Sequence, residues 1–474
     1  MSDQDLIDLQ EIAPAEVGEI DLYQRREKIY TRKIEGFFQR IRLFTGWPLL
    51  LGYLLLPWIS WDGRQSILFD LPARKFNILG LTFWPQDFPM LAFLLIISAF
   101  ALFAVTTFAG RIWCGYTCPQ TVWTTIFMWL EQKTEGSRNQ RIRLDKAPWS
   151  AQKTARKIAK HGSWLFVGFV TGLTFVGYFY PIKQLVPDLT TLDLNGWPLF
   201  WIAFFTIATY INAGWMREQV CMYMCPYARF QSVMFDHDTL IVSYDKRRGD
   251  PRGSRKRDAD HKELGLGECI DCELCMQVCP TGIDIRNGLQ YQCIAWAACI
   301  DACDDVLDKM NYDRGLVRYT TLNEVKGKGL HILRPRVYFY TAILSGLIIA
   351  MFWSLIVRVP VGLDITRDRN ILYREAANGD LENVFMLKIM NQDSRAHNFI
   401  ISIDGLPGAT LDPDQDETYA ASGEIVDTLV RVRASEDIIK DRSTNITFKI
   451  TATDNEKMTD EEDARFIAPA DWFQ

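Results

Sequence analysis

The middle of the chain holds four closely spaced cysteines, Cys269, Cys272, Cys275 and Cys279, with Pro280 directly after the last. This C-x2-C-x2-C-x3-C-P spacing is chemically demanding. Three thiolates on a tight loop reach three irons of a cubane, while the fourth points to a neighbouring cluster. Close cysteine pairs also bind zinc, but four cysteines this close ending in Cys-Pro suit a tetrahedral zinc site poorly. The run therefore predicts iron–sulfur ligation of the bacterial ferredoxin kind.

A second run repeats this spacing with one departure, because Trp296 stands where its second cysteine is expected. In two-cluster ferredoxins the last cysteine of each run ligates the other cluster. The expected ligands of the first cluster, a [4Fe-4S] cluster, are Cys269, Cys272, Cys275 and Cys303. The expected ligands of the second cluster are Cys279, Cys293 and Cys299. Since one ligand is missing there, the second cluster is expected to be either [4Fe-4S] or [3Fe-4S].

Two further cysteine pairs share the motif Cys-x-Tyr-x-Cys-Pro, and each pair follows an apolar segment. The pairs are Cys114 with Cys118 and Cys221 with Cys225. The proline after each second cysteine suits the first turn of a new helix, because its missing N–H is not needed there. Four thiols at one membrane face are soft donors that suit Cu(I), and they could equally cycle between dithiol and disulfide. Cysteines that serve only as small buried apolar side chains are the third alternative.

The elements that position these cysteines are predicted to lie in a membrane. Apolar residues make up 48% of the chain and charged residues 23%, but the apolar residues are gathered into long runs. A spanning helix needs ~20 predominantly apolar residues. The segments expected to span are 43–61, 88–108, 163–182, 197–215 and 337–357.

Lysine and arginine set the expected orientation. They are dense before residue 43 and between 109 and 162, and sparse in the 62–87 and 183–196 loops. Because cytoplasmic loops carry the excess of these residues, the N-terminus, both cysteine pairs and the iron–sulfur module are expected on the cytoplasmic side of a bacterial inner membrane. The tail after residue 358 is then expected in the periplasm. The N-terminal forty residues lack the apolar core of a secretory signal, so the N-terminus is expected to be retained.

The tail has a different pattern, with short period-two runs separated by Gly, Pro, Asp and Asn, which indicates a small β-sandwich. The predicted fold is an α-helical polytopic membrane protein with an inserted two-cluster ferredoxin domain (α+β) and a C-terminal Ig-like β-sandwich. The predicted domains are 1–42, a cytoplasmic segment; 43–245, the membrane domain; 246–336, a linker and ferredoxin-like domain; 337–357, the fifth span; and 358–474, the Ig-like domain.

Other redox and nucleotide motifs are absent from the sequence: there is no Cys-x-x-Cys-His, no Gly-x-Gly-x-x-Gly after a strand and no Walker loop. No nucleic-acid partner is expected, although the net charge of -6 decides little, because it averages a basic middle with an acidic C-terminal third. Electrons are therefore expected to come from another protein or from quinol.

With these residues in view, the chain resembles the CcoG/FixG/RdxA family of cytochrome c oxidase accessory proteins, which are membrane-bound polyferredoxins. The resemblance covers nearly the whole chain. It rests on the segments RREKIYTRKIEGFFQRIR, WCGYTCPQTVWT, CMYMCPYARFQSVMFD and CIDCELCMQVCPTGIDIRNGLQYQC, and on the Ig-like tail. The chain departs from the family at Trp296, where the family looks to have cysteine.

The resemblance implies a role in assembling the cbb-type haem–copper oxidase, by reducing Cu(II) to Cu(I) for the catalytic subunit of the oxidase. In this interpretation the protein is a cupric reductase, and copper-delivery proteins are further partners. The family's Cys-x3-Cys-Pro motifs fall on the expected copper-reducing thiols, Cys114, Cys118, Cys221 and Cys225.

Two other classes of protein share some of these features. One is a quinol dehydrogenase subunit of the NapH type, which has similar spans and ferredoxin motifs. The other is a non-redox assembly scaffold whose clusters are structural. The additional acidic β-domain favours the accessory protein over the quinol dehydrogenase subunit.

Overall fold

The computed structural model describes residues 28–61, 63–257, 259–329, 331, 333–367, 372–376, 379–393, 395–411 and 417–469. The N-terminal segment predicted over 1–42 is described from Lys28 onward, and residues 1–27 lie outside the described residues. The chain divides into two units, Met1–Ile59 with Ala92–Ile348, and Ser60–Leu91 with Ile349–Gln474. Two of the three boundaries fall within long helices, α3 (Phe88–Ala109) and α15 (Pro335–Val357), and the third lies between Ile59 and Ser60.

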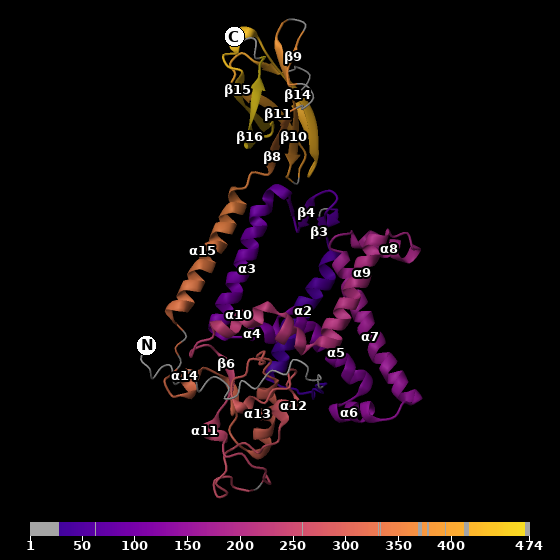
Figure 1. Cartoon of the computed structure of the whole chain (residues 1–474), viewed down its shortest axis with the longest axis vertical. Helices are drawn as coiled ribbons and strands as arrows, with labels where there is room; N and C mark the ends of the chain where they lie inside the picture. Colours follow the sequence, from indigo (N-terminus) through magenta and orange to yellow (C-terminus); the bar gives the residue numbers. More distant parts are fainter. Residues whose placement is uncertain are drawn as a thin grey trace. The chain divides into compact units, whose positions relative to one another are not determined.

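Helices make up most of the first unit (Figure 1). Besides α3 and α15 they are α2 (Phe37–Leu55), α4 (Ile112–Tyr116), α5 (Pro119–Glu135), α6 (Arg138–Lys146), α7 (Ala151–Val176), α8 (Ile182–Thr191), α9 (Gly196–Thr209), α10 (Pro226–Met234), α11 (Lys246–Gly249), α12 (Leu274–Gln277), α13 (Ala298–Met310) and α14 (Leu322–Val325). Two π-helical segments, η3 (Tyr210–Met216) and η4 (Val220–Met224), follow α9. The predicted helix starts at Pro119 and Pro226 are confirmed.

Four helices in the described part of the chain are long and apolar enough to cross a membrane. They are Phe37–Trp58, Phe88–Ala109, Gly196–Met216 and Pro335–Val357, and they overlap four of the five predicted spans. The predicted span over 163–182 is not among them. Its apolar residues belong to α7, which begins with a lysine-rich half and ends at Val176, so the apolar part is shorter than the ~20 residues needed. The apolar half of α7 nevertheless runs antiparallel along α9, with Gly168 beside Thr206 and Gly172 beside Ile202. It therefore lies beside a helix long enough to span and can serve as the fifth crossing.

A small α+β module lies within the first unit. β6 (Ile241–Tyr244) pairs antiparallel with β7 (Val317–Thr320), and α12 and α13 lie side by side. Their common core contains Val242, Ile300 and Leu307. This arrangement places both cysteine runs of the predicted ferredoxin domain around one apolar centre.

The second unit is built from antiparallel strands. Its C-terminal strands are β8 (Val361–Arg367), β9 (Arg374–Glu375), β10 (Leu381–Asn391), β11 (His397–Asp404), β12 (Thr410–Leu411), β13 (Glu417–Ala420), β14 (Ile425–Ala434), β15 (Ser443–Ala452) and β16 (Asn455–Ile467). One sheet has the order β12-β14-β10-β8, with β9 on β10, and the other has the order β13-β11-β15-β16. Phe385 of the first sheet packs edge-on against Phe448 of the second, with ring centres 5.1 Å apart. The predicted β-sandwich is confirmed.

The segment between α2 and α3 also belongs to this unit, which the sequence did not predict. Residues 60–91, which the sequence places within the membrane domain, group with the sandwich. They form the strands β1 (Ser60–Trp61), β2 (Arg64–Gln65), β3 (Ile67–Asp70), β4 (Lys75–Ile78) and β5 (Leu81–Phe83). The Arg358 guanidinium donates to Asp87 at 2.5 Å and to Gln392 at 2.7 Å, which ties this connection to the sandwich.

Candidate metal centres

The first cysteine site lies between the first cysteine loop and α13. Cys269, Cys272 and Cys275 line a small cavity together with Cys303, so the structure brings together the four ligands predicted for the first cluster. Burial raises the pKa of Cys275 and of Cys303 to about 12. Because a thiol must lose its proton to bind iron, loading this site releases protons.

The second cysteine site lies directly beside the first. Cys279, Cys293 and Cys299 line a cavity with Trp296, and Cys275 lines this cavity as well as the first. Burial raises the pKa of Cys293 to about 11 and that of Cys299 well above its ordinary value. The three predicted ligands therefore meet, and the indole occupies the fourth side.

The backbone of the second loop matches that of the first although one cysteine is missing. In each loop the residues immediately before and after the second cysteine position, Cys272 or Trp296, are in the left-handed region. They are Asp271 (φ 54°), Glu273 (55°), Ala295 (52°) and Ala297 (60°). This conformation costs roughly 1–2 kcal/mol for a residue that is not glycine, and consecutive N–H groups in such turns form a concavity for anionic groups. The donor sets, cavities and loops thus fit a cluster at each site.

Two carboxylates near the second run are already engaged. Asp301 accepts hydrogen bonds from the backbone N–H groups of Phe38 (3.1 Å) and Gln39 (2.8 Å), at the start of α2. Asp304 accepts one from Gly315 N at 3.0 Å. Asp301 therefore caps α2, and either carboxylate would give up a backbone bond to replace the missing thiolate.

The Cys-x3-Cys-Pro thiols form a third group. The electrostatic neighbours of the Cys221 thiol include Cys118, Cys114 and Cys225, and Cys225 is also a neighbour of Cys118. Cys114 Sγ donates to Gln231 on α10 at 3.4 Å. Burial raises the pKa of Cys114 to about 11 and that of Cys221 to about 12. Sequence repeats far apart in the chain are thus brought to one place.

Among the described residues, no group of three or more His, Cys, Asp or Glu side chains could hold a single metal ion. Thiols around a cubane are spaced more widely than thiols around one ion, whose metal–sulfur bonds are about 2.3 Å. The four thiols of the third group are therefore close together without forming a ready-made site for one ion.

The third group packs directly on the second cysteine site. A Cβ atom built on Gly115, between Cys114 and Tyr116, would lie 2.4 Å from Ala295 O and 3.1 Å from Ile294 O. Cys114 and Cys221 pack in the same apolar cluster as Trp296. The backbone of the first thiol motif thus contacts the backbone of the second cysteine loop.

Buried arginines hold this contact. Arg42 Nε donates to Gly115 O at 3.3 Å, an Nη group donates to Trp296 O, and the guanidinium lies 4.2 Å from the Trp296 ring centre. Arg111 donates to Tyr291 O at 2.6 Å and to Cys293 O at 3.3 Å. These bonds fix the second loop on α2 and α4.

A buried ion network supports the thiol motifs from the other side. Glu131 on α5 is fully buried and accepts from Arg141 at 3.0 Å and from Arg217 at 2.8 Å. Arg217 lies between the π-helical segments, close in sequence to Cys221. The network therefore connects α5 and α6 to the segment that carries the second thiol motif.

Sequence reasoning missed the positioning roles of Arg42, Asp301 and Gly115. Arg42 looks like one more cation before a span, and Asp301 like an acidic residue between two cysteines. The sequence offered one sign of this close contact: the position between Cys114 and Tyr116 is glycine, whereas the second motif has Met222 at the same position.

The comparisons with known families agree with these sites. Residues 216–322 match the family described as "4Fe-4S dicluster domain", residues 91–135 match "4Fe-4S binding domain", and residues 351–469 match "IG-like fold at C-terminal of FixG". Together with the apolar helices, they define a membrane protein of the iron–sulfur electron-transfer class with an Ig-like domain.

Individual relatives narrow this class. The nitrogen fixation protein FixG of Rhizobium meliloti is 37% identical over 427 residues, with 82% of each chain covered. Protein RdxA of Cereibacter sphaeroides is 38% identical over 403 residues, covering 82% of this chain and 84% of the relative. The crystal structure of a FixG-related protein from Vibrio parahaemolyticus, 27% identical, covers 23% of this chain and 95% of its own, with a TM-score of 0.21. The chain belongs to the FixG/RdxA family.

Proposed function

We propose that this protein reduces Cu(II) to Cu(I) for the assembly of a cbb-type cytochrome oxidase. The observation that carries the proposal is the contact between the thiol group of Cys114, Cys118, Cys221 and Cys225 and the second cysteine site. An iron–sulfur cluster, when bound, exchanges one electron at a time, which matches the one-electron reduction of Cu(II).

The thiols have the chemistry that such a substrate needs. Thiolates are soft ligands that favour Cu(I) over harder ions, so their binding energy favours the product of the reduction. In this proposal copper is a substrate that is bound, reduced and released. Arg42 and Gly115 keep the motif against the second loop, which shortens the path that an electron travels.

The proposed orientation follows the lysine and arginine bias. The cysteine sites face the cytoplasm of a bacterial cell and the Ig-like domain faces the periplasm, since the dense basic segments precede α2 and follow α3. The proposed partners are the catalytic subunit of the oxidase and its copper-delivery proteins. Alkaline phosphatase fused after Gln474 should be active, and an inactive fusion that still inserts would contradict this orientation.

The test of copper reduction uses the purified full chain in detergent under anaerobic conditions. Dithionite-reduced protein, freed of excess reductant, is mixed with Cu(II), and a Cu(I)-specific chelator reports the product. Changing Cys221 and Cys225 together to serine should abolish the product while iron–sulfur absorbance is retained. Met224→Leu is the matched control, because this exposed side chain lies in the same motif. Reduction at the wild-type rate in the double variant would place the site elsewhere.

A second use of the four thiols is supported by one specific observation. The match to the "4Fe-4S binding domain" family includes Cys114 and Cys118, and four thiols could hold a third cluster instead of handling copper. Iron analysis separates the two proposals. Two clusters account for about seven or eight irons per chain, whereas a third cubane would raise this to about eleven or twelve.

A further inference from the structure

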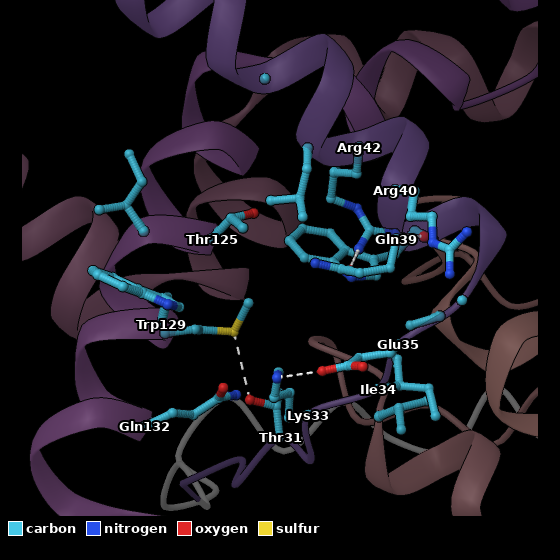
Figure 2. A pocket seen from close by; sticks show the side chains of 18 of the residues that line it. Thr31, Lys33, Ile34, Glu35, Gln39, Arg40, Arg42, Thr125, Trp129 and Gln132 are labelled. Atoms are coloured by element: carbon cyan, nitrogen blue, oxygen red, sulfur yellow. Dashed lines mark hydrogen bonds and ion pairs between the residues drawn. The ribbon is translucent and has the colours of Figure 1, made fainter.

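A cavity of about 550 Å³ lies between the start of α2, α5 and the second cysteine loop (Figure 2). Its size falls within the roughly 300–1,000 Å³ of small-molecule sites. It is separate from the two small cysteine-lined cavities and from the four thiols. The proposed copper chemistry does not use it.

The cavity has a polar end and an apolar end. The polar end comes from the segment before α2, its first turns and α5, with Lys33, Glu35, Gln39, Arg40 and Gln132. The apolar end comes from the later turns of α2, with Leu43, Trp47 and Leu50, and from the first half of α5, with Val122 and Ile126. Because α2 is one of the four helices able to cross a membrane, an occupant with a polar ring and an apolar tail would match both ends.

One wall of the cavity belongs to the second cysteine site. Trp296, Val278 and Ala298 line it, and the last two directly precede Cys279 and Cys299 in the sequence. Trp296 is 8% exposed and also lines the cavity that holds these cysteines. A single side-chain layer therefore separates the cavity from the second cysteine site.

We propose that this cavity binds the head group of a membrane quinone, and that the quinol form is the electron donor of the protein. A planar ring fits between aromatic walls such as Trp47, Trp129 and Trp296, and its two oxygens fit the amide and ionic groups of the polar end. Of the four cations that line the cavity, Arg32 and Arg40 can attract a phospholipid phosphate, and the competition experiment below distinguishes that occupant from a quinone. The other two are engaged within the protein. Lys33 is paired with Glu35 at 2.5 Å, and the Arg42 donors face Gln39, Gly115 and Trp296.

Oxidation of the quinol by this protein balances in electrons and in protons. Oxidation of a quinol to a quinone breaks two O–H bonds and releases two electrons and two protons. Two one-electron acceptors are needed, and the two iron–sulfur clusters are acceptors of this class. The protons leave at the polar end, where Glu35 is exposed and can accept one on its way to solvent. The proposal rests on the electron-transfer role of the clusters and is independent of copper.

The test measures quinone binding directly, in full-length, cluster-loaded protein in phosphatidylcholine nanodiscs. The probe is a short-tailed azido-ubiquinone, and labelled peptides are identified by mass spectrometry after illumination. Labelling is expected within residues 31–50 and 122–132, and decylubiquinone should suppress it. Anaerobic decylubiquinol should also bleach the iron–sulfur absorbance.

Two glycines of α2 provide matched variants. A Cβ on Gly46 would meet only Val122 side-chain carbons, at 3.7 and 3.9 Å, so the leucine of Gly46→Leu can enter and fill the cavity. A Cβ on Gly52 meets nothing within 4 Å, and Gly52 does not line the cavity. Gly46→Leu should weaken quinone binding about tenfold or more, and Gly52→Leu should leave it within about twofold.

Three outcomes would overturn the proposal: labelling of the wild type outside these peptides, equal binding by both variants, or displacement of the probe by phosphatidylglycerol but not by decylubiquinone. The last would make the cavity a lipid site. Photolabelling of the wild type tests whether the cavity binds quinone even if Gly46→Leu does not fold. Dithionite-driven copper reduction bypasses the quinone, so a failure here is distinguishable from a failure of the proposed function.

Discussion

Gly115→Ala tests the contact between the thiol motif and the second cysteine loop. On helix propensity alone, alanine in α4 should stabilise the protein by roughly 0.5–1 kcal/mol. The structure predicts the opposite sign, because the new Cβ would lie 2.4 Å from Ala295 O and 2.9 Å from Ala295 C. Both are backbone atoms that cannot rotate away. Overpacking of this kind costs about 1–3 kcal/mol, so after the propensity gain the net loss lies between about 0 and 2.5 kcal/mol, centred near 1 kcal/mol.

Thermal unfolding of the detergent-solubilised full chain measures this loss, and the copper assay measures its functional result. Reduction should slow because the motif is pushed away from the second loop, while the iron–sulfur absorbance stays largely intact. Gly162→Ala is the matched control, since a Cβ there meets nothing within 4 Å and should not destabilise. A Gly115→Ala protein as stable as the Gly162→Ala protein, with an unchanged reduction rate, would refute the proposed packing.

Three further predictions concern other parts of the molecule. Trp296→Cys, reconstituted with iron and sulfide, should raise the iron content from about seven to about eight per chain. The same change should remove the paramagnetic EPR signal expected from an oxidised three-iron cluster. Unchanged iron content and an unchanged EPR signal would mean that another residue is the ligand. Glu131→Gln should cost roughly 3–5 kcal/mol because it leaves buried arginines uncompensated, and a change below about 1 kcal/mol in chemical unfolding would contradict this. His397 is buried, which opposes its charge, but hydrogen bonds to Asp454 and Asp393 outweigh this and raise its pKa. Its stabilisation is therefore full below its ordinary pKa of about 6.5 and is lost as pH rises through the raised value. The protection factors of β11 amides, which correct for the intrinsic rise of exchange with pH, should therefore fall over that range in the wild type but stay constant in His397→Gln.

Much of the site was predictable because cysteine spacing is a local constraint. The crossover grouping of Cys269, Cys272 and Cys275 with Cys303 agrees with the cavity that they line, although iron ligation itself stays a prediction. Trp296 was recognisable as a departure from the spacing. Its position in a loop that keeps the left-handed turns on either side was visible only in the structure.

Other features depend on pairings between residues far apart in sequence. Asp301 caps α2 from more than two hundred residues away, and no local pattern shows this. The apolar run from 163 to 182 was long enough to predict a span, but α7 begins earlier and ends at Val176. The hydropathy of a segment does not show where a helix ends. The cavity between α2, α5 and Trp296 could not be predicted because three separate segments form it.

Electron transfer from the clusters to copper is measured by following both in the same sample. Anaerobically reduced protein is mixed rapidly with Cu(II), and reoxidation of the clusters is followed by visible absorbance while the Cu(II) signal is followed by EPR. One Cu(II) should be lost for each electron that the clusters give up, and neither change should occur at the wild-type rate when Cys221 and Cys225 are serine. Loss of Cu(II) without cluster reoxidation, or an unchanged rate in the variant, would show that electrons do not pass from the clusters to copper through these thiols.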